Sequence, residues 1–549
     1  MSADAASNQT AASDPVRAAV QLHRPFNRDL VKRFAVTDPV PSLEITRFPR
    51  IARLVKNRKF QFLLILPNQL IFWLVIFLGL VGTVVPGLNF GTAITWYLWF
   101  CLVFVMMVVV GRAWCVMCPF GGFAEWIQRL SFWKRAQKRL GLGLKMPEKV
   151  ARYGFLLSVG TFLLLTWIEE FFNIAGPGTP SDTSFMVLGI VTSALLFFLV
   201  FERRTFCRYI CPLSALIGTV GAMGSVAGFR TKDRDVCLAC KTKDCMRGGE
   251  EGYGCPWYTW PGSADSNLAC GLCSECYKGC PSNNVGLFVQ KPLTSIVAPT
   301  RRRADIAWAV AILWGLVLFQ QLNALPIYAA VDGWLNGIMH FPQYPNPVDY
   351  VGIIGAIALL MAGIVWIVMS IFVKKDLQVP KRGNSFIDRT SRFRVFFLPM
   401  MYGIIPVVGA DYFARQLPKF FKHVPRLVPA IGSIGTTGKQ VVSSVAAVAT
   451  GTGQHLSSIQ QQAQAQYAAA TKSSLFNLQL LTHPGIITVQ VAIIGVATLA
   501  AIWTSWKIGR RELTGVSSHP RLIQAVGPVL ALACGVLAST LYVMMNLGS

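Results

Sequence analysis

The stretch that decides the fold of this chain reads Cys270-Gly-Leu-Cys273-Ser-Glu-Cys276-Tyr-Lys-Gly-Cys280-Pro281. In the pattern Cys-x2-Cys-x2-Cys-x3-Cys-Pro, three thiolates on a tight turn face one 4Fe-4S cluster, and the fourth cysteine is free to ligate a second cluster. A looser copy, which also ends in Cys-Pro, precedes this stretch between residues 237 and 256. Two such copies predict a region that holds two clusters by crossed ligation.

Crossed ligation assigns four cysteines to each cluster. The first copy has longer gaps than the compact pattern, and Cys255 is where it departs most from that pattern. A structural zinc site needs four thiolates in paired Cys-x2-Cys knuckles, and the second copy has one cysteine too many for a knuckle. Disulfides are disfavoured if the region is cytoplasmic. The predicted ligands are Cys237, Cys240, Cys245 and Cys280 for one cluster, and Cys255, Cys270, Cys273 and Cys276 for the other.

The composition is that of a membrane protein. The 549 residues are 53% hydrophobic and 14% charged, and the mean hydropathy is +0.49. A net charge of +26 would suit a nucleic-acid partner, but the basic residues cluster beside apolar segments. The positive-inside rule explains this distribution, so we expect contact with membrane lipid and no nucleic acid. The basic residues before the first apolar segment place the N-terminus in the cytoplasm.

About nine apolar segments are candidates to cross a bilayer. A short outer loop with Trp334 and His340 joins the fifth to the sixth. The seventh is broken by Pro399 and Pro406, and Asp411 lies near its outer end. An odd count places the C-terminus outside. The predicted spans are 62–85, 96–111, 154–172, 185–201, 306–328, 350–373, 395–412, 486–506 and 523–542.

The predicted fold class is therefore mainly α, a polytopic membrane helix bundle with an inserted cytoplasmic two-cluster ferredoxin-like domain. The expected segments are a cytoplasmic basic N-terminal segment (1–59), a four-span membrane domain with two Cys-Pro motifs (60–212), the ferredoxin-like domain (213–300), spans five to seven (301–416), an extracytoplasmic Gln/Ser/Ala-rich segment (417–483), and spans eight and nine (484–549).

Two further Cys-Pro motifs follow the second and fourth spans, each after a basic exit from the membrane. Packing the two helix pairs about a pseudo-twofold axis would bring the motifs together, where four thiolates can hold a third iron–sulfur cluster or exchange with a disulfide. Proline after the second cysteine would end the local helix, and nearby arginines would lower the thiol pKa values. The alternative is that these are small residues at a crowded helix exit. The cysteines are Cys115, Cys118, Cys207 and Cys211, and the arginines are Arg112, Arg203, Arg204 and Arg208.

The two membrane Cys-Pro motifs followed by the two-cluster stretch resemble the NapH/NosR-type membrane polyferredoxins, over roughly residues 60–281. The FixG/CcoG group has a similar layout and is a near neighbour. The resemblance implies electron transfer between the quinone pool, or another membrane donor, and a soluble or periplasmic redox partner of a respiratory system. The chain differs from NosR in having no large flavin-binding domain before the first span, and from NapH in its greater length.

Two functions remain open at this point. The first is an electron conduit in the bacterial inner membrane, with the ferredoxin-like domain in the cytoplasm; it is a component of an oxidoreductase system rather than a stand-alone enzyme. The second is a redox-sensing or metallocofactor-assembly protein of the FixG/CcoG or NosR regulatory type. Neither a Walker loop nor a dinucleotide fingerprint is present.

Other polar residues are weaker site candidates. No Cys-x-x-Cys-His run is present, and neither haem b nor flavin is supported. We interpret His340, His423 and His483 as interfacial polar residues near the outer face rather than as haem or quinol ligands. Glu169 and Glu170 suit either proton acceptance or an ordinary helix end at the headgroups.

Overall fold

The computed structural model describes residues 42–83, 85–132, 140–174, 180–299, 302–340, 345–372, 391–434, 465, 468, 471–472, 474–513 and 520–546. Three stretches used in the sequence analysis lie outside these residues. They are most of the basic N-terminal segment, the basic residues between 134 and 139, and those between 374 and 389. Most of the Gln/Ser/Ala-rich segment, from 435 to 464, is also outside.

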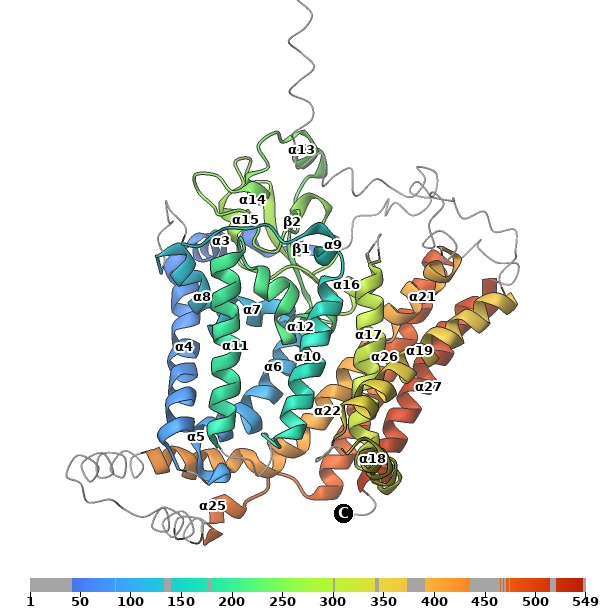
Figure 1. The fold of residues 1–549 in the computed structure, drawn as a ribbon. Helices are drawn as coiled ribbons and strands as arrows, with labels where there is room; N and C mark the ends of the chain where they lie inside the picture. The colour runs from blue at the N-terminus through green and yellow to red at the C-terminus, as the bar shows by residue number, and fades with distance from the viewer. Residues whose placement is uncertain are drawn as a thin grey trace, which may run out of the picture.

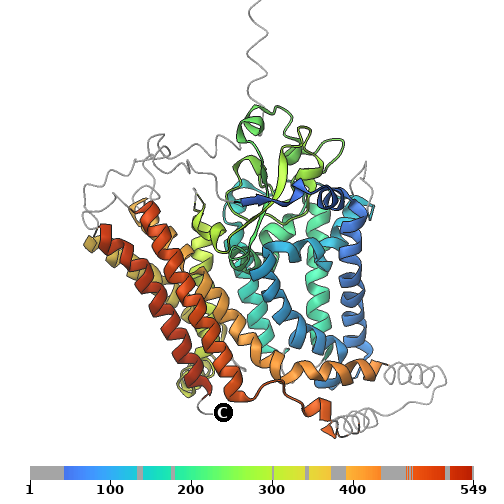
Figure 2. The same cartoon turned by 180° about the vertical axis from the view of Figure 1, so that it is seen from behind.

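The described residues form two sets of long helices that stand side by side, and a cysteine-rich region covers one end of the first set (Figure 1). Eight helices are long and apolar enough to cross a membrane, and one bent pair raises the count to nine. This agrees with the predicted number of spans. The reverse view shows the C-terminal end of the last helix at the end of the bundle opposite the cysteine-rich region (Figure 2).

The first set contains the four helices that carry the Cys-Pro motifs. The predicted spans are found within a few residues of their expected bounds, because continuous apolar runs of this length have no other stable conformation in a bilayer. Short helices lie between and after the long ones, and two of them, α8 and α12, begin at the prolines of the Cys-Pro motifs. The long helices are α4 (Arg58–Val81), α6 (Phe100–Val110), α10 (Gly154–Phe171) and α11 (Pro180–Val200), and the short ones are α5 (Phe90–Thr92), α7 (Trp114–Met117), α8 (Pro119–Arg129), α9 (Glu148–Ala151) and α12 (Pro212–Gly221).

The second set is built around one central helix. The apolar window of this helix, α17 (Ala304–Leu322), is 83% buried, whereas the windows of the other candidate spans are 28–44% buried. It therefore lies between neighbours while the others expose apolar side chains outward. The remaining helices are α18 (Pro326–Met339), α19 (Pro347–Phe372), α21 (Ser391–Gly403), α22 (Ile405–His423), α25 (Ser474–Asn477), α26 (His483–Glu512) and α27 (Pro520–Asn546).

Three expectations for this second set need correction. The stretch with Trp334, predicted as an outer loop, forms helix α18, which Pro326 begins and His340 ends in a left-handed conformation. The seventh segment bends by 41° at Ile404, next to Pro406 as predicted, but Pro399, which was also expected to break it, lies inside α21. Helix α22 continues past the predicted end, because residues as far as Ala430 pack with Trp96 in a contact that no local pattern reveals.

Asp411 lies beside residues near the C-terminal ends of α17 and α27, which agrees with its predicted place near the outer end of the segment, but its side chain is enclosed by protein. Its side chain is completely buried in α22, where Gln321 of α17 donates a hydrogen bond to one carboxylate oxygen at 2.6 Å. The Tyr542 hydroxyl of α27 bonds the Asp411 backbone carbonyl at 2.9 Å. Helix α22 thus presents this carboxylate to its neighbours rather than to the membrane surface.

The cysteine-rich region, residues 226–290, is organised by a small antiparallel sheet of strand order β1-β3-β2. Strand β1 (Ser42–Glu44) pairs with β3 (Val285–Gln290), so the chain before the first span joins this region. Strand β2 (Val226–Thr231) pairs with the other edge of β3. Short helices complete it: α3 (Pro49–Lys56), α13 (Arg234–Ala239), α14 (Asp244–Arg247), α15 (Glu275–Lys278) and α16 (Thr294–Val297).

Candidate redox site

Twelve of the fourteen cysteines gather into three groups of four, and none of the fourteen forms a disulfide. We call these groups the outer set, the inner set and the motif set. The outer set is Cys237, Cys240, Cys245 and Cys280; the inner set is Cys255, Cys270, Cys273 and Cys276; the motif set is Cys115, Cys118, Cys207 and Cys211.

The outer set surrounds a hollow of about 310 Å³, which all four of its cysteines line. Burial raises the pKa of the Cys245 thiol to about 12, and the charges of the other three cysteines of the set raise it too. Cys240 differs because its thiol is only slightly buried. Its slight burial favours a higher pKa, but hydrogen bonds from Lys243 and Thr242 and the Lys243 charge outweigh it and lower the pKa.

The inner set is more deeply buried. Three of its members, Cys255, Cys273 and Cys276, are 6–7% exposed. Burial raises the pKa of the Cys276 thiol well above its ordinary value, and the other three thiols of the set raise it further. Cys255 therefore lies with Cys270, Cys273 and Cys276, the group in which the crossed pattern places it, despite its irregular spacing.

A glycine allows the sheet to approach the inner set. Gly228 in β2 has a φ of +88°, and a Cβ atom built there would lie 3.0 Å from the Cys270 sulfur. Strand β2 shifts its register at this residue, in a bulge that turns the backbone toward the cysteine. A side chain at this position would therefore fill space beside the thiol.

The motif set forms where the two Cys-Pro turns meet. Cys118 and Cys211 each precede a proline at the first position of a helix, α8 and α12 respectively. As expected, the local helix ends just before each proline, at Met117 and at Ile210. Each proline also begins the next helix, because proline lacks the N–H that the first helical turn leaves unused. Cys207 lies in the π-helical turn Phe206–Ile210. Gly121 in α8 lies so close that an added Cβ would be 3.2 Å from the Cys207 sulfur.

The expectation that arginines lower the thiol pKa values of this set is wrong. Burial raises the pKa of Cys207 well above its ordinary value, and the opposing charge of Arg204 is too weak to reverse it. Burial and the neighbouring cysteines likewise raise the pKa of Cys211 to about 12. Arg203 instead donates a hydrogen bond to the Cys255 carbonyl oxygen at 2.8 Å. It therefore holds the backbone of the inner set rather than a thiol of the motif set.

Shared packing connects the three sets in the order outer, inner, motif. Cys245 and Cys280 of the outer set pack in one apolar cluster with Cys276 and Cys270 of the inner set, around Phe229. Members of the inner and motif sets share a second cluster: it contains Cys255 and Trp257 together with Cys115, Cys207 and Cys211. The inner set therefore lies between the other two.

Two buried arginines occupy the boundary between the inner and motif sets. Arg204 pairs with Glu125 and donates a hydrogen bond to the Cys115 carbonyl oxygen at 2.8 Å, and its charge acts on cysteines of both sets. Arg112 donates hydrogen bonds to the Leu268 carbonyl and Ser214 hydroxyl at 2.6 and 2.8 Å. Its guanidinium lies 4.4 Å from the Trp257 ring centroid.

A third ionic group supports the inner set from its other side. Glu275, between Cys273 and Cys276 in the chain, is buried and pairs with Lys278 and Arg58. Its burial favours a raised pKa, but these cations and Arg129 outweigh that effect and lower the pKa of Glu275 to about 2. Neither Glu275 nor Glu125 is predicted as a site residue from the sequence. Their position beside the cysteine motifs is the one feature that could have pointed to them.

Each set has four thiols, the number of ligands that one 4Fe-4S cluster requires. Within the described residues, no three His, Cys, Asp or Glu side chains converge closely enough to hold one metal ion. A zinc site would require four sulfurs at about 2.3 Å from a single ion. A cubane distributes its four thiolates over four irons, so they lie further apart. Four neighbouring buried thiols also need cationic iron before all of them can lose their protons.

The remaining candidates lie away from the cysteines. His340 and His483 belong to the ends of α18 and α26, and the His423 ring lies 5.1 Å from the Tyr97 ring. Glu170 accepts hydrogen bonds from Gln320 at 3.0 Å and Arg415 at 3.3 Å. The structure therefore places Glu170 in an ion-paired contact between α10, α17 and α22.

Two segments, residues 92–139 and 183–227, match the family model described as a 4Fe-4S binding domain. Each segment contains one Cys-Pro motif of the motif set, whereas residues 237–281 lie outside both. The match supports an iron–sulfur protein, and such a domain suggests electron transfer in general. No curated protein and no solved structure matches this chain.

Proposed function

We propose that this protein conducts electrons between a donor in the bacterial inner membrane, the quinone pool, and a redox partner that docks at the outer set. The observation that carries the proposal is the succession of three four-cysteine sets, packed one against the next, from the helix bundle to the hollow at the surface. The resemblance to NapH/NosR-type polyferredoxins also implies electron transfer between the quinone pool and a redox partner.

Each set would hold one 4Fe-4S cluster, which supplies a one-electron centre when bound. The family match favours a cluster over a dithiol at the motif set, because both matched segments contain its cysteines. The surrounding residues bury the thiolates, exclude water and fix the sulfur positions. Arg112 and Arg204 place positive charge at the boundary between two sets, where it stabilises the added negative charge of a reduced centre.

Iron analysis tests the number of centres. Anaerobically purified protein should contain about twelve irons by the three-cubane count. Cys118→Ser and Cys211→Ser should each reduce the content toward about eight and block electron flow, while Cys101→Ala, a buried cysteine outside the sets, should change neither. About eight irons in the wild type would make the motif set a dithiol site. Stoichiometric zinc without iron would refute the electron-transfer proposal.

A fusion experiment tests the side of the membrane. A reporter that is active only in the periplasm should be active when fused after Ser549, because α27 ends opposite the cysteine-rich region (Figure 1). The same reporter inserted near Gly249 should be silent, because the proposal places this region in the cytoplasm. The reverse result would show an inverted topology.

A further inference from the structure

The second set of helices buries a carboxyl group that has no cation as a partner. Asp411 of α22 is completely enclosed, and among the described residues no Lys, Arg or His forms an ion pair with it. Arg415, one turn further along α22, pairs instead with Glu170 of α10 at 3.3 Å. A buried ionised carboxylate without a cation is costly, and such a group usually becomes neutral.

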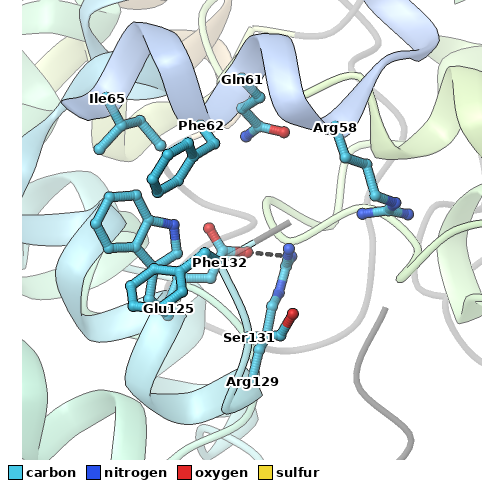
Figure 3. A pocket seen from close by; sticks show the side chains of 9 residues that line it. Arg58, Gln61, Phe62, Ile65, Glu125, Arg129, Ser131 and Phe132 are labelled. Atoms are coloured by element: carbon cyan, nitrogen blue, oxygen red, sulfur yellow. Dashed lines mark ion pairs between the residues drawn. The ribbon is translucent and has the colours of Figure 1, made fainter. Parts of the chain in front are cut away.

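The buried carboxylates near the cysteine sets are different. Figure 3 shows the ion pair between Glu125 and Arg129, and Glu125 also pairs with Arg204. Glu275 likewise pairs with two cations, as described above. The first set of helices thus supplies cations to the carboxylates that it buries. The absence of such a pair favours a protonated, neutral Asp411.

Two oxygen atoms without partners indicate where this proton lies. Gln321 of α17 donates a hydrogen bond from its amide nitrogen to Asp411 Oδ1 at 2.6 Å. The other carboxyl oxygen, Asp411 Oδ2, and the amide oxygen, Gln321 Oε1, have no hydrogen-bond partner among the described residues. Both atoms can only accept while Asp411 is ionised. One proton on Oδ2 makes this oxygen a donor to Oε1, which closes a ring in which acid and amide satisfy each other.

Few titratable or charged groups face this position. Within the described residues, α17 and α26 present glutamine amides to this part of α22, and α6 and α12 present apolar side chains. Helix α10 contributes Glu170 through its ion pair with Arg415. The other titratable or charged groups are Tyr412 and Arg415 of α22 itself, and Cys534 and Tyr542 of α27.

A row of polar groups leads from Asp411 to the bundle end opposite the cysteine-rich region (Figure 1). Asp411, Arg415 and Lys419 follow one another at intervals of one helical turn, so they lie on one face of α22. Arg415 pairs with Glu170, and Lys419 pairs with Glu169 at 3.7 Å. Exposure of the acidic side chains rises along this row, from 0% at Asp411 to 13% at Glu170 and 20% at Glu169.

We propose that Asp411 is a proton-binding site, which holds one proton as a neutral acid paired with Gln321 and exchanges it with water by way of Glu170. In the exchange, the O–H bond of Asp411 breaks and the Glu170 carboxylate takes the proton and passes it to water. A proton from water returns by the same route. The site lies outside both segments that match the 4Fe-4S binding domain, so it does not depend on the cysteine sets.

Infrared spectroscopy of the full-length protein in detergent tests the site. The carbonyl stretch of a protonated carboxyl is separate from the amide and carboxylate bands, and it moves to lower frequency when deuterium replaces the proton. At neutral pH, the difference between wild type and Asp411→Asn should contain one such band, which should move in D2O. Asp411→Asn should fold, because its amide can form the same ring with Gln321. Iron content and dithionite reduction, both expected to be unchanged, check this.

Two further variants test the route. Glu170→Gln should slow the movement of the band in D2O at least about tenfold, because the amide cannot relay a proton as the carboxylate does. Asp182→Asn is the matched control, because Asp182 is an acid in the first turn of α11, at the same end of the bundle (Figure 1). It should leave both the band and its exchange rate unchanged.

Each outcome decides one part of the proposal. The band and its exchange in the wild type, with slow exchange in Glu170→Gln alone, support the site and its route. No band difference in Asp411→Asn would overturn the site, since Asp411 would then be ionised. A band that does not move in D2O would overturn the exchange, and an unchanged rate in Glu170→Gln would overturn the route. If Asp411→Asn does not fold, Gln321→Leu replaces it: the band should move to higher frequency because the acid loses its partner, and an unmoved band would overturn the pairing.

Discussion

The outer and inner cysteine sets have the same number of thiols but different surroundings. The outer set lines a surface hollow, and its Cys240 has a lowered pKa. The inner set is enclosed by protein, and its Cys276 has a strongly raised pKa. Under the proposed function, we expect the outer set to exchange electrons with a partner and the inner set to relay them through the interior.

Removing a central ligand of the inner set should have the largest effect. Cys276→Ala should lose about four irons and interrupt flow between the other sets, since four irons depend on four thiolates. Cys240→Ala should also lose iron from its own set but leave reduction of the inner and motif sets by menadiol intact. Iron content and cluster absorbance measure both. Equal loss of menadiol reduction in the two variants would contradict the order of the sets.

Breaking the ion pair between Arg204 and Glu125, at the boundary of the inner and motif sets, should cause the next largest effect, a loss of stability. Arg204→Gln leaves buried Glu125 with Arg129 as its only paired cation, so we expect a loss of about 3 kcal/mol of stability. Lys232→Gln is the control: its pair with Glu44 is 39% exposed on the lysine side and should cost less than about 1 kcal/mol. Thermal loss of cluster absorbance compares the two, and similar costs would mean that the boundary is not tightly packed.

Filling the space beside the inner set should have a smaller effect. Gly228→Ala combines an unfavourable positive φ with a close contact to the Cys270 sulfur and should cost about 2 kcal/mol. Gly143→Ala has a positive φ of 63° and no atom within 4 Å of the new Cβ, so it should cost only about 1 kcal/mol. The same thermal measurement applies, and an altered reduction potential should appear only in Gly228→Ala.

The smallest expected effect concerns iron release. Under mild oxidation with ferricyanide and a chelator, about one third of the iron, that of the outer set, should leave first, because the Cys240 thiol is only slightly buried and lines the hollow. Cys240→Ala should lack this fast phase. A single phase that releases all iron from the wild type would show that burial does not distinguish the sets.

Local patterns were sufficient for some features. The spacing of residues 237–281 predicts the division between outer and inner sets, and apolar run length predicts the spans within a few residues. The same patterns missed Glu125 and Glu275, because a single carboxylate beside a motif has no periodicity. They also missed that the helix with Asp411 continues past Tyr412, since a helix that bends and continues cannot be distinguished locally from one that ends at the membrane surface.

By itself, the sequence determined which segments are apolar and long enough to span a membrane, and approximately how many there are. This follows from a chain-local property, hydropathy over a window. Only the tertiary structure decided that β1 joins the cysteine-rich sheet and that burial outweighs arginine in setting the thiol pKa values. Those outcomes depend on which distant segments exclude water from the same place, and no stretch of sequence encodes that alone.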